Sequence, residues 1–309
     1  MRPWLANDRV FKTHEEIRKE RPVMAAAQAN HEQIRYWNEQ SGPRWVKQQQ
    51  RLDAQLDRLG LAAMQRAGVK PGEHVLDVGC GCGQTSLELA ERVGPRGSVL
   101  GLDISQPMLA RARERQNELR VQNLALLRAD AQTYPLGRER FDLIFSRFGI
   151  MFFDDPPTAF RNLCTALRPA GRLCFICWQA LEKNEWVRVP LMAAAQHVAP
   201  PAPLPPGAPG PFAFADPERV RSLLEAGGFK EVSCESYETQ LSLGGATSVD
   251  EAVEFVLEIG VIERLLHDAD AHVRARVAEA IRAALAPYTN RDGVSLSGVA
   301  WIVLARPER

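Results

Sequence analysis

The sequence predicts an α/β fold: a Rossmann-like, seven-stranded, mostly parallel sheet that is sandwiched by helices. Between residues 68 and 178, short apolar runs alternate with helical stretches, a pattern that is typical of strand–helix–strand crossover units. Right-handed crossovers place helices on both faces of such a sheet. The 309 residues are 45% hydrophobic and 25% charged, so the chain can bury a large core and is not disordered as a whole.

Seven short apolar runs are the expected strands. They lie at 74–78 (HVLDV), 98–103 (SVLGLD), 124–130 (LALLRAD), 141–146 (FDLIFS), 171–178 (GRLCFICW), 229–237 (FKEVSCESY) and 298–306 (GVAWIVLAR). Helices are expected at about 84–93, 106–118 and 157–168, from Asp216 to Gly227, from Ser248 to about 266, and at roughly 271–286. Asp216 before Pro217, and Ser248 with Glu251, are helix-capping patterns.

We expect two parts in the chain, a helical extension or lid at residues 1–67 and a main domain at 68–309. Apolar residues recur at helical spacing in the extension, at Leu52, Leu56, Leu59 and Met64. Insertions into the main domain at about 179–215 and 245–290 are expected to form a helical cap. The proline-rich loop at 200–211 is expected on the surface, either as an inert connector or as a lid over a ligand.

The charge balance and the apolar runs limit the partners and the compartment. Lys plus Arg and Asp plus Glu both number 38, and a net charge of zero argues against a duplex-binding protein or an anionic-membrane binder. No run approaches the roughly 18 apolar residues of a membrane-spanning helix. The first dozen residues lack the apolar centre of a secretory signal. We therefore expect a cytoplasmic protein, monomeric or homodimeric, whose partner is a small molecule.

The six cysteines are too few for a disulfide scaffold in a chain of this length, so reduced thiols are expected. Cys174 and Cys177 have the CxxC spacing, but they lie in the expected strand at 171–178. Residues three apart on a strand point to opposite faces, so the two thiols do not grip one metal ion. They are expected to be small buried hydrophobic side chains.

Between the strand at 74–78 and the helix that begins near Gln84, the chain turns on Gly79, Gly81 and Gly83. Glycine tolerates unusual φ angles and lets a ligand lie against the backbone. The N-terminus of the following helix adds unpaired N–H groups and partial positive charge. The turn is therefore suited to an anion, either a pyrophosphate or a carboxylate.

Two features distinguish these anions. The dinucleotide fingerprint G-x-G-x-x-G/A, counted from Gly79, requires a small residue where Gln84 stands. Asp77, directly before the turn, repels a pyrophosphate but holds an ammonium group through water or backbone. A ligand that carries both an ammonium and a carboxylate is an amino acid.

The segment from Asp77 to Gly83 resembles the first motif of class I S-adenosylmethionine-dependent methyltransferases. Further segments resemble later motifs of that family in the same order: Asp103, Asp130-Ala131, FDLIFSRFGIMFF at 141–153 and LRPAGRLCFICW at 167–178. The whole chain most resembles the small-molecule branch of the ubiquinone- and menaquinone-biosynthesis type, also called methyltransferase type 11. The segments HEQIRYWNEQSGPRWV (31–46) and GPFAFADPERVR (210–221) resemble a bacterial subgroup of this branch.

The resemblance implies that a methyl group moves from S-adenosylmethionine to a small apolar or aromatic acceptor by in-line displacement, which leaves S-adenosylhomocysteine. It also implies that Asp103 binds both ribose hydroxyls and that Asp130 and Ala131 meet the adenine. The expected cofactor-binding residues are Asp77, Gly79, Cys80, Gly81, Gly83, Thr85, Asp103, Ile104, Met108, Asp130, Ala131, Ser146, Arg147, Tyr36 and Trp45. No metal is expected, because the ends of the fourth and fifth strands lack the acids that Mg²⁺ prefers.

The catalytic and acceptor-binding residues are less defined, because no general base is evident from spacing. His197 is a candidate base, or else a surface or structural histidine. Arg147 is a candidate for binding a substrate anion, or else part of a structural ion pair. The candidate acceptor-binding residues, for which ordinary packing is the alternative role, are Phe148, Met151, Phe152, Trp178, Trp186, Phe212 and Phe214.

Two other functions remain open on the sequence. The glycine turn with Asp103 also suits a NAD(P)-dependent oxidoreductase. The lack of an evident base also suits a non-catalytic S-adenosylmethionine-binding protein. Asp155-Pro156-Pro157 resembles part of the [DN]PP[YF] motif of amino-group DNA methyltransferases, but it lies well beyond the fourth strand and is expected to start a helix.

Overall fold

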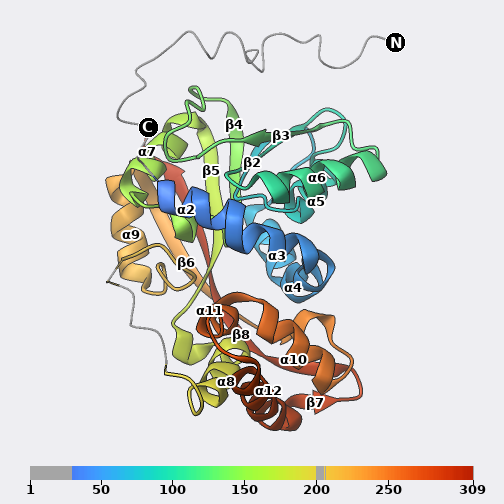
Figure 1. The fold of residues 1–309 in the computed structure, drawn as a ribbon. Coiled ribbons are helices and arrows are strands. Elements are labelled where there is room, and N and C mark those ends of the chain that lie inside the picture. The colour runs from blue at the N-terminus through green and yellow to red at the C-terminus, as the bar shows by residue number, and fades with distance from the viewer. Residues whose placement is uncertain (1–29, 200–204, 206, 309) are drawn as a thin grey trace.

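The computed structural model describes residues 30–199, 205 and 207–308. The expectations for residues 1–29, and for 200–204 and 206 of the proline-rich loop, lie outside the described residues. The strands are β1 (His74–Val78), β2 (Ser98–Asp103), β3 (Leu124–Arg128), β4 (Phe141–Arg147), β5 (Leu167–Trp178), β6 (Phe229–Ser242), β7 (Thr289–Asn290) and β8 (Gly293–Pro307). Within the described residues they form one sheet of order β3-β2-β1-β4-β5-β8-β6, with β7 paired to β8 (Figure 1).

The sheet is mostly parallel, as predicted. The five strands from β1 through β5 pair with their neighbours in parallel, whereas β8 runs antiparallel to both β5 and β6. Each of the seven predicted runs corresponds to one strand of this path, and β1 and β2 match their predicted bounds at both ends. The two-residue β7 is an addition that the sequence did not predict. The strands β6 and β8 are longer than predicted, because they continue to pair with each other as far as Ser242 and Ser295.

The helices in the described residues are α2 (His31–Arg35), α3 (Ser41–Lys47), α4 (Gln49–Ala67), α5 (Gln84–Val93), α6 (Gln106–Glu118), α7 (Pro156–Ala166), α8 (Glu185–Ala194), α9 (Pro217–Ala226), α10 (Val249–Glu258), α11 (Gly260–Leu265) and α12 (Ala271–Leu285). The π-helical turn η2 (Tyr36–Gln40) joins α2 to α3. The predicted helices at 84–93 and 106–118 coincide with α5 and α6. None of the described helices is long and apolar enough to cross a membrane.

Two helical segments differ from the prediction. The helix expected from Ser248 to about 266 is interrupted, because Ile259 is extended (φ −128°, ψ 141°) and Gly260 has a φ of +71°. The result is two helices, α10 and α11, with a bend between them. The helix α8 lies in the insertion at about 179–215, which was expected to form part of a helical cap but without a stated helix position, and its internal Pro190 conceals the helical pattern.

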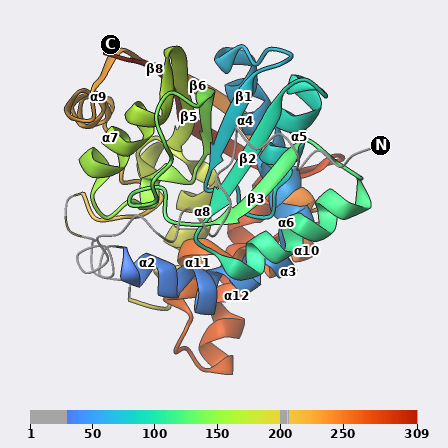
Figure 2. The same cartoon turned by 90° about the horizontal axis from the view of Figure 1, so that it is seen from above.

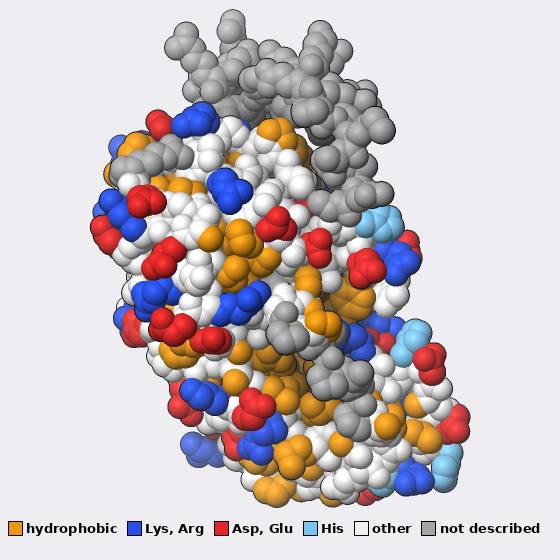
Figure 3. All heavy atoms as spheres, turned by 90° about the vertical axis from the view of Figure 1, so that its left-hand side faces the viewer, with side chains coloured by type: hydrophobic (Ala, Val, Ile, Leu, Met, Phe, Trp, Pro, Cys, Tyr) orange, Lys and Arg blue, Asp and Glu red, His pale blue; other side chains and the backbone are white. Residues whose placement is uncertain are grey.

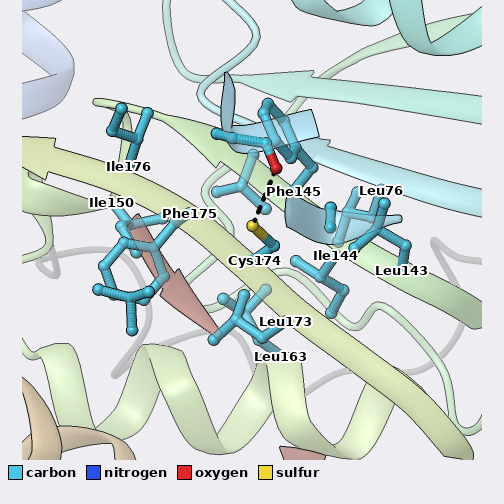
Figure 4. Packing of buried hydrophobic residues seen from close by; sticks show 14 of the residues in the cluster. Leu76, Leu143, Ile144, Phe145, Ile150, Leu163, Leu173, Cys174, Phe175 and Ile176 are labelled. Atoms are coloured by element: carbon cyan, nitrogen blue, oxygen red, sulfur yellow. Dashed lines mark hydrogen bonds between the residues drawn. The ribbon is translucent and has the colours of Figure 1, made fainter. Parts of the chain in front are cut away.

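Helices cover both faces of the sheet. Figure 2 shows α4, α5 and α6 on one side of the strands, and α7 and α9 on the other. The thiol of Cys174 donates to the Ala63 carbonyl of α4 (Figure 4), whereas the thiol of Cys177 donates to the Phe214 carbonyl just before α9. The two cysteines therefore point to opposite faces, as predicted. Both are fully buried, and burial raises the pKa of Cys174 to about 12.

The main core lies between the sheet and its helices. On the α7 side, the ring of Phe160 packs at centroid distances of 6.0–6.3 Å against Phe175, Phe214 and Phe229. All four rings are almost completely buried. Each such side chain stabilises the fold by roughly 1.5–3 kcal/mol relative to an exposed one. Figure 4 shows the adjacent aliphatic packing around Leu76, Ile144 and Leu173.

A second buried cluster lies in the cap. The helices of the two predicted insertions, α8 and α10 to α12, pack there with the far ends of β6 and β8 (Figure 1). Its fully or almost fully buried members include Leu243, Phe255, Ile281 and Leu296. The face seen in Figure 3 carries acidic and basic side chains side by side, with apolar side chains between them.

Polar contacts tie the N-terminal helices to the cap. Arg44 of α3 pairs with Glu263 of α11 at 2.6 Å. Lys47 and Gln48 both reach Glu258 at the end of α10, at 2.7 and 2.5 Å. The helices α3 and α4 thus bridge the sheet and the cap, and the space between these three parts is the pocket described next.

Candidate functional site

A pocket lies at the carboxyl ends of β1, β2 and β4, where the strand order reverses between β1 and β4. Ligands bind to open α/β sheets at such a switch point. The pocket continues from the sheet toward α10 and α11, and its cavity volume is about 230 Å³.

The pocket brings together most of the predicted site residues. From the cofactor set, its lining includes Gly79, Cys80, Gly81, Thr85, Asp103, Ile104, Met108, Asp130, Ala131, Arg147 and Trp45. From the acceptor set, its lining includes Phe148, Met151, Phe152, Trp178, Trp186 and Phe212. These residues come from strands, helices and loops that lie far apart in the sequence.

The glycine turn follows β1 and forms the floor of the pocket. Gly79, Gly81 and Gly83 have φ angles of +70°, +55° and +84°, which side chains other than glycine rarely adopt. A Cβ on Gly79 would lie 2.7 Å from the Cα of Gly149 in the loop after β4. The two loops therefore touch backbone to backbone, and the turn is open to a ligand on its pocket side. Gly83 itself does not line the pocket, because it packs against Ala112 of α6.

Asp77 lies beneath the turn and does not line the pocket. Its Oδ2 accepts hydrogen bonds from the hydroxyls of Thr85 and Ser86 at 2.7 and 2.6 Å. Its Oδ1 is buried without a hydrogen-bond partner among the described residues. Burial raises the pKa of Asp77, and the two hydroxyl donors oppose that shift. The structure thus places this carboxylate as a link between β1 and α5, outside the pocket lining.

Asp103, at the end of β2, presents its carboxylate to the pocket from a fixed position. Oδ2 accepts the N–H of Gly81 and Oδ1 accepts the N–H of Ser105, both at 2.8 Å. Burial raises the pKa of Asp103 to about 6, and these backbone donors lower it only in part. The carboxylate is therefore held against the glycine turn while further lone pairs remain for a ligand.

Asp130 and Ala131 follow β3 on the same side of the pocket. Asp130 Oδ1 accepts the N–H of Gln132 at 2.9 Å, whereas Oδ2 is buried and accepts no hydrogen bond from the described residues. Burial raises the pKa of Asp130. A buried acceptor without a donor is costly, so this oxygen is suited to a donor group on a bound ligand.

Arg147 ends β4 and lines the pocket opposite Asp103. Its guanidinium donates to Gln84 Oε1 at 2.5 Å, at the N-terminus of α5. Burial lowers the pKa of Arg147, and the charges of Asp53, Asp77 and Asp57 oppose that effect. Among the described residues, no carboxylate lies within ion-pair distance of this guanidinium. The structural ion pair that the sequence left open is therefore not formed with a described side chain.

The far half of the pocket is an aromatic chamber, which we define by Phe148, Phe152, Trp178 and Trp186. Phe148 stacks on Trp178 with ring centroids 4.2 Å apart and planes at 12°. Trp186 lies 4.9 Å from Trp178, and Trp37 contacts Phe152 edge-on at 5.2 Å. Phe148 has a φ of +61°, a strained backbone conformation that is frequent at functional sites.

Several predicted residues lie outside the pocket lining. Phe214 was expected to bind the acceptor, but it is buried in the core because Phe160 and Phe175 surround it. His197 is not placed as a base, because its ring lies beside the Arg276 guanidinium of α12 at 2.8 Å. Ser146 is buried, and its hydroxyl donates to the carbonyl of Val78. Tyr36 packs edge-on against Trp37.

Two groups of lining residues were not predicted. The first is a stripe on α4 formed by Gln49, Leu52, Asp53 and Leu56. Its spacing of three, four and seven residues marks one helix face, and this signal was visible in the sequence but was interpreted only as packing. The second group comes from the cap and comprises Leu243, Phe255, Val256, Ile259, Gly260, Val261 and Ile262. No local pattern distinguishes these residues from an ordinary core.

The ionisable lining residues define the chemistry that the pocket offers. They are Asp53, Asp103, Asp130, Arg147, Cys80 and Cys82. The two cysteines are neutral thiols, because burial raises the pKa of Cys82 to about 12 and raises that of Cys80 well above its ordinary value. No group of three His, Cys, Asp or Glu side chains in the described part of the chain is arranged to hold a metal ion.

Comparison with known proteins identifies the part of the chain that carries this site. Residues 69–199 match the family model of a methyltransferase domain. Demethylmenaquinone methyltransferase of Oceanobacillus iheyensis is 34% identical over 113 residues, which are 37% of this chain and 48% of that protein. The chain thus spans about half the length of the curated relatives that it matches.

Solved structures agree at the level of the fold. The YcgJ protein from Bacillus subtilis aligns with 81% of this chain and 98% of its own, with a TM-score of 0.52 and 18% identity. A phosphoethanolamine N-methyltransferase from Haemonchus contortus, solved with S-adenosylhomocysteine, aligns with 81% of this chain and 52% of its own, with a TM-score of 0.50 and 20% identity. Residues 69–199, which include the glycine turn and both strand-end aspartates of the pocket, therefore match a methyltransferase domain, and the chain shares the fold of the aligned structures.

Proposed function

We propose that the protein transfers a methyl group from S-adenosylmethionine to a small, flat, largely apolar acceptor. The observation that carries this proposal is the continuity of one pocket. The glycine turn, Asp103 and Asp130 line its polar end, and the aromatic chamber lines the other. A polar nucleoside and an apolar acceptor are thereby brought to the same space.

The residues of the polar end fit the cofactor. Asp103 has lone pairs free for two ribose hydroxyls, and Asp130 Oδ2 is a buried acceptor suited to an exocyclic amine. The glycine turn gives a backbone cradle that needs glycine, because a Cβ at Gly79 or Gly81 would lie 2.7 Å from Gly149 or 2.8 Å from Met108. When bound, S-adenosylmethionine supplies a methyl group that is activated by its sulfonium. The methyl–sulfur bond breaks as the acceptor donates its electron pair, and the sulfur keeps the bonding electrons.

The protein contributes mainly alignment and exclusion of water. Holding the two reactants in line can supply roughly 7–11 kcal/mol of the barrier reduction. The aromatic chamber keeps the acceptor in a fixed plane and keeps water from the reacting atoms. Its walls support one another, because Phe148 stacks on Trp178 and Trp186 packs at a tilt against Trp178. We propose that this alignment takes place without a metal ion.

The relatives suggest the class of acceptor. The curated proteins that match are named as demethylmenaquinone methyltransferases. A quinone-derived or phenolic ring of that kind suits a chamber walled by aromatic side chains, since offset stacking favours flat rings. We further propose that the protein acts in the cytoplasm as a monomer or homodimer. We also propose that it acts without nucleic acid, because its acidic and basic residues balance.

We expect purified protein to transfer labelled methyl from S-adenosylmethionine to at least one member of a panel of hydroquinones, phenols and aromatic amines. Trp178→Leu should raise KM for that acceptor while leaving the affinity for S-adenosylhomocysteine unchanged, because Trp178 lies on the acceptor side. Met192→Leu, at an exposed position of α8, is the matched control. Binding of NADH in place of S-adenosylhomocysteine would refute the proposal and favour an oxidoreductase. Cofactor binding with no transfer across the panel would favour a non-catalytic binding protein.

The affinity for S-adenosylhomocysteine should increase with pH across about pH 5–7, because only ionised Asp103 accepts both ribose hydroxyls and its pKa is about 6. Calorimetric titrations at several pH values measure this, and Asp103→Asn should remove the dependence. The contribution of Asp103 to the stability of the ligand-free protein should instead decrease as the pH rises. A pKa raised in the folded state means that this group's contribution to stability is complete below its ordinary value and is lost as the pH rises through about 6.

A further inference from the structure

The amino-acid tail of the proposed cofactor carries one positive and one negative charge. Apart from Asp103, which is proposed to bind the ribose, the pocket offers one side chain of each sign beside the glycine turn. Asp53 comes from α4, and Arg147 comes from the end of β4. Both line the same pocket as Gly79 and Gly81. Asp77, which the sequence favoured for the ammonium group, has its Oδ2 bound to two hydroxyls beneath the turn. The carboxylate that faces the pocket at this point is that of Asp53.

Asp53 is fixed relative to the glycine turn by its neighbours. Its Oδ2 accepts a hydrogen bond from Gln49 at 2.5 Å and pairs with Arg115 at 3.0 Å. Arg115 in turn donates to the carbonyl of Cys82 within the turn, at 2.8 Å. Both partners of Asp53 contact Oδ2, and among the described residues no hydrogen bond reaches Oδ1. That oxygen is therefore available to a cationic group in the pocket.

Arg147 is fixed at the other end of the turn. Gln84 accepts its hydrogen bond and donates in turn to Asp57, at 3.0 Å, so the amide holds the guanidinium at the start of α5. A Cβ on Gly60 would lie 3.2 Å from the Arg147 side chain, so the absence of a side chain on α4 makes room for it. A guanidinium has five N–H donors, and the bond to Gln84 uses one of them. A buried cation is stabilised only when an anion or several acceptors surround it. The charges of Asp53, Asp77 and Asp57 act on Arg147, but no described carboxylate forms an ion pair with it.

We propose that Asp53 and Arg147 bind the two ends of the cofactor's amino-acid tail, Asp53 its ammonium and Arg147 its carboxylate. This inference rests on the proposed function, because it assumes that the turn receives that tail. Both side chains act as positioning residues: by fixing the tail, they direct the sulfonium toward the aromatic chamber. A planar guanidinium suits a carboxylate because two parallel hydrogen bonds join them.

Binding measurements with ligands that lack one end of the tail test the inference without relying on activity. The ligands are S-adenosylhomocysteine, its decarboxylated analogue, its deaminated analogue, and 5′-methylthioadenosine, which lacks both charged ends. Asp53→Asn should weaken the binding of S-adenosylhomocysteine by about tenfold or more and leave the affinity for the deaminated analogue unchanged. Arg147→Met should weaken the binding of S-adenosylhomocysteine by a similar factor and leave the affinity for the decarboxylated analogue unchanged. Neither substitution should change the affinity for 5′-methylthioadenosine.

Matched controls separate local binding from general changes in charge or folding. Glu88→Gln and Arg92→Met remove one charge of each sign from an exposed pair on α5, and both should leave every affinity unchanged. If either pocket variant does not fold, the wild-type protein still provides the test. It should bind S-adenosylhomocysteine about tenfold or more tightly than either shortened analogue.

The outcomes for the inference and for the proposed function are distinct. Two outcomes would overturn the roles of Asp53 and Arg147 and leave the methyltransferase proposal standing. One is an equal loss of affinity for all four ligands in both variants. The other is equal affinity of the wild-type protein for S-adenosylhomocysteine and its two analogues. A wild-type protein that binds none of the four nucleosides would overturn the proposed function itself.

Discussion

Gly79→Ala is expected to destabilise the protein by about 2–5 kcal/mol and to abolish cofactor binding. The φ of +70° costs a residue with a Cβ about 1–2 kcal/mol. The new Cβ would also lie 2.7 Å from the backbone of Gly149, and such overpacking costs about 1–3 kcal/mol. Because Gly149 belongs to the loop that leads into the aromatic chamber, relief of the clash must separate the two halves of the pocket. Denaturant unfolding and calorimetric titration measure the two effects.

Gly68→Ala is the matched control for this substitution. Gly68 has a similar φ of +60°, at the end of α4, but a Cβ there meets no atom within 4 Å. It should therefore show only the cost of the left-handed backbone, about 1–2 kcal/mol, and unchanged affinity for S-adenosylhomocysteine. Equal destabilisation in the two variants would show that the contact between the loops after β1 and β4 does not constrain the site.

Asp103→Ala is expected to weaken the binding of S-adenosylhomocysteine by roughly 10- to 150-fold, which corresponds to the loss of about 1.5–3 kcal/mol in charge-assisted hydrogen bonds. The carboxylate of Asp103 has two roles. It presents lone pairs to the ribose, and its Oδ2 holds the N–H of Gly81 in the glycine turn. Alanine removes both contacts, so the turn also loses an anchor. Calorimetry with the purified variant gives the change directly.

Two further variants show which role of Asp103 dominates. Asp103→Asn keeps one oxygen acceptor and removes the charge, so its affinity should lie between those of the wild type and the alanine variant. Glu114→Ala, an exposed residue on α6, is the control for loss of a carboxylate near the site. An unchanged affinity in Asp103→Ala would contradict the assignment of the ribose-binding acid and the polar end of the pocket with it.

The sheet and the glycine turn were predictable because their signals are local. The runs at 74–78 and 98–103 are apolar and short, and the structure has β1 and β2 at those bounds. The positive φ angles at Gly79, Gly81 and Gly83 need glycine whatever surrounds them. The opposite orientation of Cys174 and Cys177 follows from the period of a strand.

The differences between the expected and the observed positions mainly concern residues whose surroundings are contributed by distant segments. Phe214 and Phe212 are two positions apart in one loop, yet only Phe212 reaches the pocket, because Phe214 meets the rings of Phe160 and Phe175 in the core. His197 was a plausible base by type alone, but Arg276 lies beside it. The bend at Ile259 also had no local signal strong enough to break the predicted helix.

The sequence by itself determined the parallel sheet, the turn and the acids at the ends of β2 and β3, because strand period, backbone φ and strand order are properties of short segments. Only the tertiary structure decided which carboxylate faces the pocket beside the turn. Asp77 is adjacent to the turn in sequence but lies beneath it, whereas Asp53 is more than twenty residues away and lines the pocket. The same holds for the aromatic chamber and the cap, since their walls form only when α4, β4, β5 and α10–α11 pack together.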